Sequence, residues 1–185
     1  MAGMIWTRWL DHITYIFLRR IYQSPQRILG GYLSPGMTVL DVGCGTGYFS
    51  LPMARMVGAK GRVVSVDLEA EEIRELNDRA AKAGLSERID TRVCSDDSLG
   101  IDELASQIDF ALAFYVAHHA ADPHRLMTEI FNGLRPKGRF LLAEPKHHAS
   151  AEVCSLVENT ARQAGFTLGG RPKIARAWAV LFIKE

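Results

Sequence analysis

The sequence has few cysteines and no long uncharged apolar run, the features that mark disulfide-rich, zinc-binding and membrane proteins. It contains three cysteines, Cys44, Cys94 and Cys154, which lie far apart and form no C-x-x-C pair. Neither a disulfide framework nor a cysteine-based zinc site is therefore predicted. No uncharged run reaches the roughly 18 residues that a membrane-spanning helix needs, and no small-residue cleavage site follows a clean apolar core. These absences favour a protein of a reducing, cytoplasmic compartment without integral membrane association.

An excess of charge of one sign is also missing. Lys and Arg number 22 and Asp and Glu 21 in 185 residues, for a net charge of +1, which removes the global electrostatic argument for nucleic-acid binding. The distribution is nevertheless uneven: residues 1–30 carry +3, residues 31–159 carry −6 and residues 160–185 carry +4. With 48% apolar residues, the chain is long enough to bury one core, so a single domain is expected.

Short β-branched runs alternate with helical segments between residues 37 and 185, a pattern typical of parallel βαβ units. Strands are expected at residues 37–41, 62–66, 90–94, 109–115, 139–143, 166–168 and 177–183. Helices are expected at residues 5–22, 48–57, 69–83, 101–106, 123–134 and 151–164. Asp122 followed by Pro123 is a start signal for the fifth of these, because aspartate caps a helix and proline suits its first position. A turn is expected at residues 135–138 and a basic loop at residues 169–173.

The most informative segment is VLDVGCGTG, residues 39–47, in which a strand ends in Asp41 and glycines follow at Gly43, Gly45 and Gly47. Glycine permits positive φ and lets a ligand approach the backbone closely, and the helix that follows presents free N–H groups. A second acid, Asp67, stands at the tip of the next strand, where a carboxylate can accept hydrogen bonds from both hydroxyls of a ribose. The combination predicts a nucleoside-bearing ligand at this edge of the sheet.

Together these motifs resemble the class I S-adenosylmethionine-dependent methyltransferases, over roughly residues 30–185. The resemblance implies an α/β fold with a single Rossmann-like doubly wound sheet, mostly parallel and seven-stranded with an antiparallel last strand, and an N-terminal helix. The domain would occupy residues 31–185, with residues 1–30 as a helical cap. The cofactor implied is S-adenosylmethionine and the product released is S-adenosylhomocysteine.

The resemblance also assigns site residues. In the family the glycine loop holds the methionine end of the cofactor, the acid after the second strand holds the ribose, and an acid after the third strand meets the adenine amino group. The cofactor-binding residues implied here are Asp41, Gly43, Cys44, Gly45, Gly47, Asp67, Leu68, Asp96 and Phe114. Residues 134–139 match the family's turn before the fifth strand, with Lys137 where glycine is commoner.

Histidines follow two of the expected strands. His118 and His119 come after the fourth strand, and His147 and His148 after the fifth, so all four should lie near the carboxyl edge of the sheet, where ligands bind. Methyl transfer from a sulfonium needs mainly positioning and desolvation, and a base is optional. His118 and His119 are the candidate catalytic residues, and ordinary loop histidines remain the alternative. No helical i, i+4 spacing supports a metal held by the two pairs, so no metal site is predicted.

Two missing motifs narrow the methyl acceptor. Relatives that methylate base amines carry an Asn/Asp-Pro-Pro-aromatic run after the fourth strand, and those that methylate arginine carry two glutamates there, but residues 113–117 read AFYVA and no glutamate lies between Asp109 and Asp122. The acceptor expected is a small molecule, anionic or apolar. The alternative function is a cofactor-binding scaffold or a partner-dependent methyltransferase subunit. For the helix expected at residues 5–22, three roles are open: it could cover the cofactor, complete the core or rest on a membrane surface.

Overall fold

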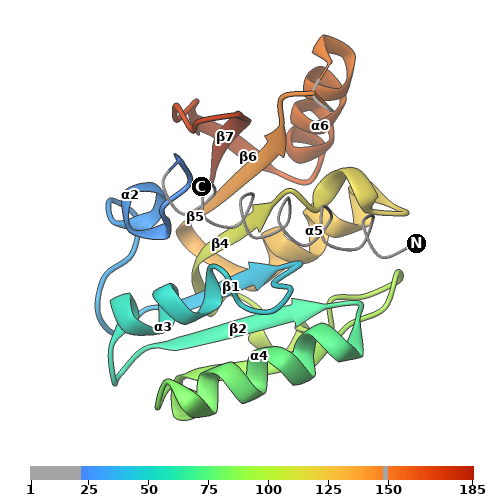
Figure 1. Ribbon diagram of the computed structural model, residues 1–185. Helices are drawn as coiled ribbons and strands as arrows, with labels where there is room; N and C mark the ends of the chain where they lie inside the picture. The colour runs from blue at the N-terminus through green and yellow to red at the C-terminus, as the bar shows by residue number, and fades with distance from the viewer. Residues whose placement is uncertain (1–21, 148–149) are drawn as a thin grey trace, which may run out of the picture.

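A seven-stranded sheet is the centre of the molecule, which a computed structural model describes for residues 22–147 and 150–185 (Figure 1). The strand order is β3-β2-β1-β4-β5-β7-β6. Every pairing is parallel except those of β7, which runs antiparallel to β5 and to β6. The strands are β1 (Thr38–Val42), β2 (Arg62–Asp67), β3 (Ile89–Val93), β4 (Ile108–Phe114), β5 (Leu134–Pro145), β6 (Phe166–Gly170) and β7 (Ala177–Lys184). The expected doubly wound, mostly parallel sheet is thereby confirmed.

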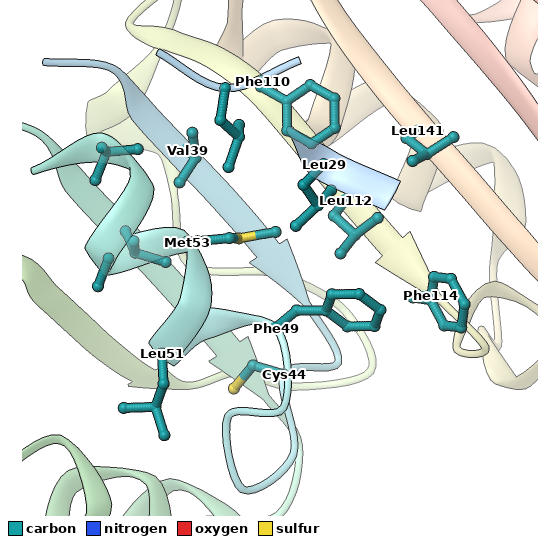
Figure 2. Packing of buried hydrophobic residues seen from close by; sticks show 14 of the residues in the cluster. Leu29, Val39, Cys44, Phe49, Leu51, Met53, Phe110, Leu112, Phe114 and Leu141 are labelled. Atoms are coloured by element: carbon teal, nitrogen blue, oxygen red, sulfur yellow. The ribbon is translucent and has the colours of Figure 1, made fainter. Parts of the chain in front are cut away.

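Helices cover both faces of this sheet (Figure 1). They are α2 (Pro25–Leu29), α3 (Ser50–Val57), α4 (Ala70–Lys82), α5 (Pro123–Gly133) and α6 (Ala151–Gln163), joined by 3-10 turns η1 (Ser86–Arg88), η2 (Asp102–Leu104) and η3 (Ala117–His119). The first three helices pack in one apolar cluster and α5 and α6 in the other. The central strand β4 supplies both clusters, because alternate side chains point to opposite faces: Phe110 and Leu112 enter the first, shown in Figure 2, and Ala111 enters the second.

Most of the expected boundaries agree with the structure to within two residues. The start of α5 is the clearest case, since Asp122 accepts a hydrogen bond from the backbone N–H of Arg125 at 3.0 Å and Pro123 is the first helical residue. Side-chain capping is a local interaction, so a short stretch of sequence is sufficient to predict it.

Four features differ from expectation. Helix α2 was not predicted, the helix expected at residues 101–106 is the short turn η2, and β6 extends into the expected basic loop as far as Gly170. Residues 135–138 lie within β5 and do not interrupt it. They form a bulge, because the pairing with β4 jumps from Ile108↔Leu134 to Phe110↔Arg139 and Lys137 has φ +65°.

All but the last residue of the helix expected at 5–22, and also His148, lie outside the described residues. In the described ranges no helix has the length and apolarity to cross a membrane.

Candidate active site

The glycine loop after β1 lies against the chain that leaves β4. Gly43, Gly45 and Gly47 all have positive φ, of +65°, +50° and +86°. A Cβ atom on Gly43 would stand 2.3 Å from Cγ2 of Val116, closer than real side-chain contacts allow. Glycine is therefore required at position 43 both by backbone conformation and by the close approach of Val116.

Asp67, at the end of β2, is oriented by backbone donors from two segments. Its Oδ2 accepts a hydrogen bond from the N–H of Gly45 at 2.7 Å, and its Oδ1 accepts one from the N–H of Glu69 at 3.0 Å. The backbone N–H groups of Gly43 and Cys44 both donate to the carbonyl of Val66, at 2.9 and 3.0 Å. These bonds hold the glycine loop beside the carboxylate that was predicted to meet a ribose.

Two side chains that no sequence motif predicts support these loops. Arg79 of α4 donates from Nη1 to the carbonyl oxygen and the hydroxyl of Thr46, at 2.6 and 2.7 Å. Glu129 of α5 accepts hydrogen bonds from the N–H of Leu99 at 2.7 Å and from the hydroxyl of Ser98 at 3.4 Å. Each supporting residue lies about thirty positions from the loop it contacts, and no local motif marks it.

Asp41 lies beneath the glycine loop and is only 2% exposed. Its Oδ2 accepts a hydrogen bond from the hydroxyl of Ser50 at 2.6 Å, and Ser65 donates in turn to the Ser50 oxygen at 3.0 Å. This buried polar chain joins the ends of β1 and β2 to the first residue of α3. A carboxylate inside the fold needs such partners, because burial without them is costly. The predicted contact of Asp41 with the cofactor stays a prediction.

A cavity of about 190 Å³ opens at the carboxyl ends of β1 to β4. Five residues predicted for the site line it: Gly43, Asp67, Leu68, Asp96 and His119. The Leu68 side chain is half exposed beside the two carboxylates, so the cavity offers an apolar surface flanked by hydrogen-bond acceptors. Cavities of this kind, at the carboxyl edge of a parallel sheet, are the usual ligand sites of such folds.

Cys44 and Phe114 are buried in the core cluster shown in Figure 2. The ring of Phe114 packs against Phe49 with 4.6 Å between centroids and against Tyr115 with 4.5 Å. Burial, together with the negative charges of Asp41 and Asp67, raises the pKa of the Cys44 thiol far above its ordinary value. These contacts favour a packing role for both side chains at the base of the site.

His118 and His119 lie in η3, and Glu144 of β5, which no sequence motif predicts, is the partner of His118. Nδ1 of His118 lies 2.5 Å from Oε2 of Glu144, and the His118 backbone N–H donates to Oε1 of the same carboxylate at 3.2 Å. Glu144 is 1% exposed. Burial raises the pKa of its carboxyl group, an effect that the neighbouring His118 opposes. The two histidine rings are 3.9 Å apart between centroids.

Tyr115, which lines the cavity and has φ +65°, is joined to distant parts of the chain. Nε2 of Gln23 donates to the Tyr115 hydroxyl at 2.5 Å and to the carbonyl of Ala175 at 3.0 Å, and Tyr115 donates to the carbonyl of Arg176 at 3.2 Å. The β4 end of the cavity is therefore built from three separate stretches. Within the described ranges, no group of three or more His, Cys, Asp or Glu side chains could hold a metal ion.

Several known proteins are similar to this chain. A family model described as a methyltransferase domain matches residues 33–175. A ubiquinone biosynthesis O-methyltransferase of Parvibaculum lavamentivorans is 31% identical over 139 residues, which are 75% of this chain and 50% of that protein. A 23S rRNA (uracil(1939)-C(5))-methyltransferase of Acinetobacter baumannii is 49% identical over 53 residues, which are 29% of this chain and 12% of that protein. The chain thus spans half or less of the length of these relatives.

Among solved structures, a SAM-dependent methyltransferase from Aquifex aeolicus superposes with a TM-score of 0.80 at 21% identity. The match covers 90% of this chain and 93% of that one. At this level of identity the likeness demonstrates a shared fold.

Proposed function

The chain belongs to the class I S-adenosylmethionine-dependent methyltransferase family, and from this premise we propose that it transfers a methyl group to a small-molecule acceptor and releases S-adenosylhomocysteine. One observation supports the proposal above all: the Asp67 carboxylate is fixed by the N–H of Gly45 at the wall of a cavity that also contains Asp96 and Leu68. Adenosine offers hydrogen-bond donors at its ribose hydroxyls and its amino group and has an apolar base face. Two carboxylates after successive strands, with an apolar side chain between them, are complementary to these groups.

The residues present fit the cofactor well. Asp67 would accept hydrogen bonds from the ribose hydroxyls, Asp96 from the adenine amino group, and Leu68 would cover the apolar face between them. Gly43, which lines the cavity, would present its backbone to the methionine portion. S-adenosylmethionine, when bound, supplies a methyl group on a positively charged sulfur. Asp41, Cys44, Gly45 and Gly47 keep their proposed place at the methionine end, and Phe114 keeps its proposed place near the cofactor. Asp41, Cys44 and Phe114 are buried and would support the loop without being exposed to the ligand.

We further propose that the methyl acceptor is a small anionic molecule. Beyond the end of β5, a hollow of about 710 Å³ is lined by three cationic side chains, Lys146, Arg171 and Lys173, and by Trp178. Arg171 is paired with Glu158. Cations beside an aromatic side chain suit a small molecule that carries an acidic group on an apolar body. A ubiquinone biosynthesis O-methyltransferase that matches 75% of this chain also favours a small molecule. The three cysteines, none of which forms a disulfide, favour the cytoplasm.

The test is cofactor binding measured by calorimetry. We expect Asp67→Ala to weaken binding of S-adenosylhomocysteine by about 100-fold or more, because two hydrogen bonds to a charged acceptor are lost. Asp102→Ala, which removes an exposed carboxylate in η2, is the control and should retain wild-type affinity. Asp67→Asn tests the charge with the shape retained, and thermal unfolding checks that each variant is folded.

Wild-type affinity in the folded Asp67→Ala variant would show that the ribose assignment is wrong. A scaffold or partner-dependent subunit makes a different prediction, namely a purified chain that binds S-adenosylhomocysteine, transfers no methyl group across an acceptor panel, and gains activity with a copurifying protein.

A further inference from the structure

We infer that Glu144 and His118 act together as a general base on the methyl acceptor. Glu144 orients the imidazole ring, and His118 removes the proton from a hydroxyl group of the methyl acceptor. This inference rests on the proposed methyl transfer and specifies its substrate class: an anionic small molecule methylated on oxygen. His118 is the catalytic residue in this assignment and Glu144 the positioning residue.

The burial of Glu144 is the first observation behind it. A carboxylate that is 1% exposed costs several kcal/mol in desolvation unless partners compensate. Both of its oxygens face the same histidine, Oε2 at the ring and Oε1 at the backbone N–H. The carboxylate thereby fixes the position and the ring orientation of His118, whose side chain retains 17% exposure. A buried acid behind a partly open imidazole is the arrangement that activates a histidine as a base.

The position of the pair is the second observation. His119, whose ring is 3.9 Å from that of His118, lines the cofactor cavity. On the other side, Glu144 is paired across β5 and β7 with Trp178, which lines the basic hollow with Lys146 and Lys173. His118 and Glu144 line neither space themselves, but each has a neighbour that does, His119 at the cavity and Trp178 at the hollow. Asp67 and Asp96 follow β2 and β3, so the ribose and adenine contacts lie at the opposite end of the cavity.

The chemistry follows from the tautomer that this contact selects. With Nδ1–H donating to the Glu144 carboxylate, the unprotonated ring nitrogen of His118 is Nε2. As the acceptor oxygen bonds to the methyl carbon, the carbon–sulfur bond breaks and its electron pair stays on sulfur, which becomes neutral. The hydroxyl proton passes to Nε2, and the Glu144 carboxylate stabilises the imidazolium that results. His118 then returns the proton to water.

A hydroxyl acceptor makes the inference testable with two probes. We would measure methyl transfer to 3,4-dihydroxybenzoate, which must lose a proton, and to 4-nitrocatechol, which is largely ionised at mildly alkaline pH. General-base catalysis contributes roughly 100-fold or more, so His118→Ala should lower kcat on 3,4-dihydroxybenzoate by about that factor, with partial rescue by added imidazole. Glu144→Gln should lower kcat about 10-fold with little change in KM. Both losses should be much smaller on 4-nitrocatechol.

His124→Ala, which removes an exposed histidine of α5, is the matched control and should behave as wild type. Equal losses on both probes in the His118 and Glu144 variants would overturn the inference. So would a wild-type enzyme that binds S-adenosylhomocysteine but methylates neither probe, whereas an enzyme that does not bind S-adenosylhomocysteine would instead overturn the proposed function.

A second measurement does not depend on turnover. Nitrogen-15 chemical shifts distinguish the two imidazole tautomers, and we expect His118 to be Nδ1-protonated in the wild type and redistributed toward Nε2–H in Glu144→Gln. Glu144→Asp, which keeps the charge on a shorter side chain, should give an intermediate result and serves if the glutamine variant does not fold. An Nε2-protonated wild-type His118, or an unchanged tautomer in both variants, would rule out the orienting role.

Discussion

The two ends of the cavity are built in different ways. At the β2 and β3 end, Asp67 is held by backbone donors at Gly45 and Glu69, 22 and two residues away in sequence. At the β4 end, which Tyr115 and His119 line, contacts from outside the cavity join His118 to Glu144 across 26 residues and Gln23 to Tyr115 across 92. The first end is made by loops that directly follow strands. The second is made by side chains that only the assembled sheet brings together.

This difference implies that the two ends can be perturbed separately. Changes at the β2 and β3 end should alter affinity for S-adenosylhomocysteine, because those residues are placed to contact the adenosine. Changes at the β4 end and at Glu144 behind it should alter turnover at nearly constant affinity for S-adenosylhomocysteine.

The largest effect is expected where the two ends touch, at Gly43. Gly43→Ala would place a methyl group 2.3 Å from Val116 in a backbone conformation with φ +65°. We expect a loss of about 2–3 kcal/mol of unfolding free energy and a severe loss of S-adenosylhomocysteine binding, measured by thermal unfolding and calorimetry.

Gly58→Ala is the matched control, because Gly58 has φ +69° but no atom within 4 Å of a Cβ built there. In Gly58→Ala the loss of unfolding free energy should come from backbone strain alone, without a steric clash. The double variant Gly43→Ala/Val116→Ala should recover part of the stability. If the double variant is no better than Gly43→Ala alone, contact with Val116 is not the cause.

A smaller effect is expected at the β3 end. Asp96 lines the cavity, whereas the neighbouring Asp97 has a 91% exposed side chain that pairs with Arg125 at 3.2 Å. Loss of one hydrogen bond predicts about 10-fold weaker binding of S-adenosylhomocysteine in Asp96→Ala. Asp97→Ala should stay within about two-fold, since exposed ion pairs contribute little. The opposite ranking in calorimetry would assign the adenine contact to Asp97.

The smallest effect concerns the reactivity of Cys94, which lines the cavity. Burial, reinforced by Asp67, raises the pKa of this thiol to about 11, so about 0.1% is thiolate at about pH 8. Alkylation by iodoacetamide should therefore be slow and should accelerate about tenfold per pH unit up to about pH 11.

Bound S-adenosylhomocysteine should slow alkylation of Cys94 and leave Cys154, on α6, unaffected. Peptide mass spectrometry measures both sites in one sample. Equal protection of the two cysteines would indicate a global change in the protein and not occupancy of the cavity.

The sequence was most informative where structure depends on neighbours along the chain. The glycines after β1, the acids at the tips of β2 and β3, and the Asp122 cap of α5 were all placed correctly, because loop conformation and capping depend on a few consecutive residues. The face to which Phe114 points was not predicted. A central strand carries apolar side chains on both faces, so its sequence shows no alternation of polar and apolar residues that would indicate which face a side chain points to.

By itself, then, the sequence determined the order of the strands along the chain, the glycine loop and the carboxylates that follow two strands, since each rests on local conformational preference. Only the tertiary structure decided that Arg79 supports Thr46, that Asp41 is buried beneath the loop, and that Glu144 meets His118. Those contacts depend on the register of β5 beside β4 and on how helices pack against the sheet. The register is set by burial of whole strand faces, which no short motif records.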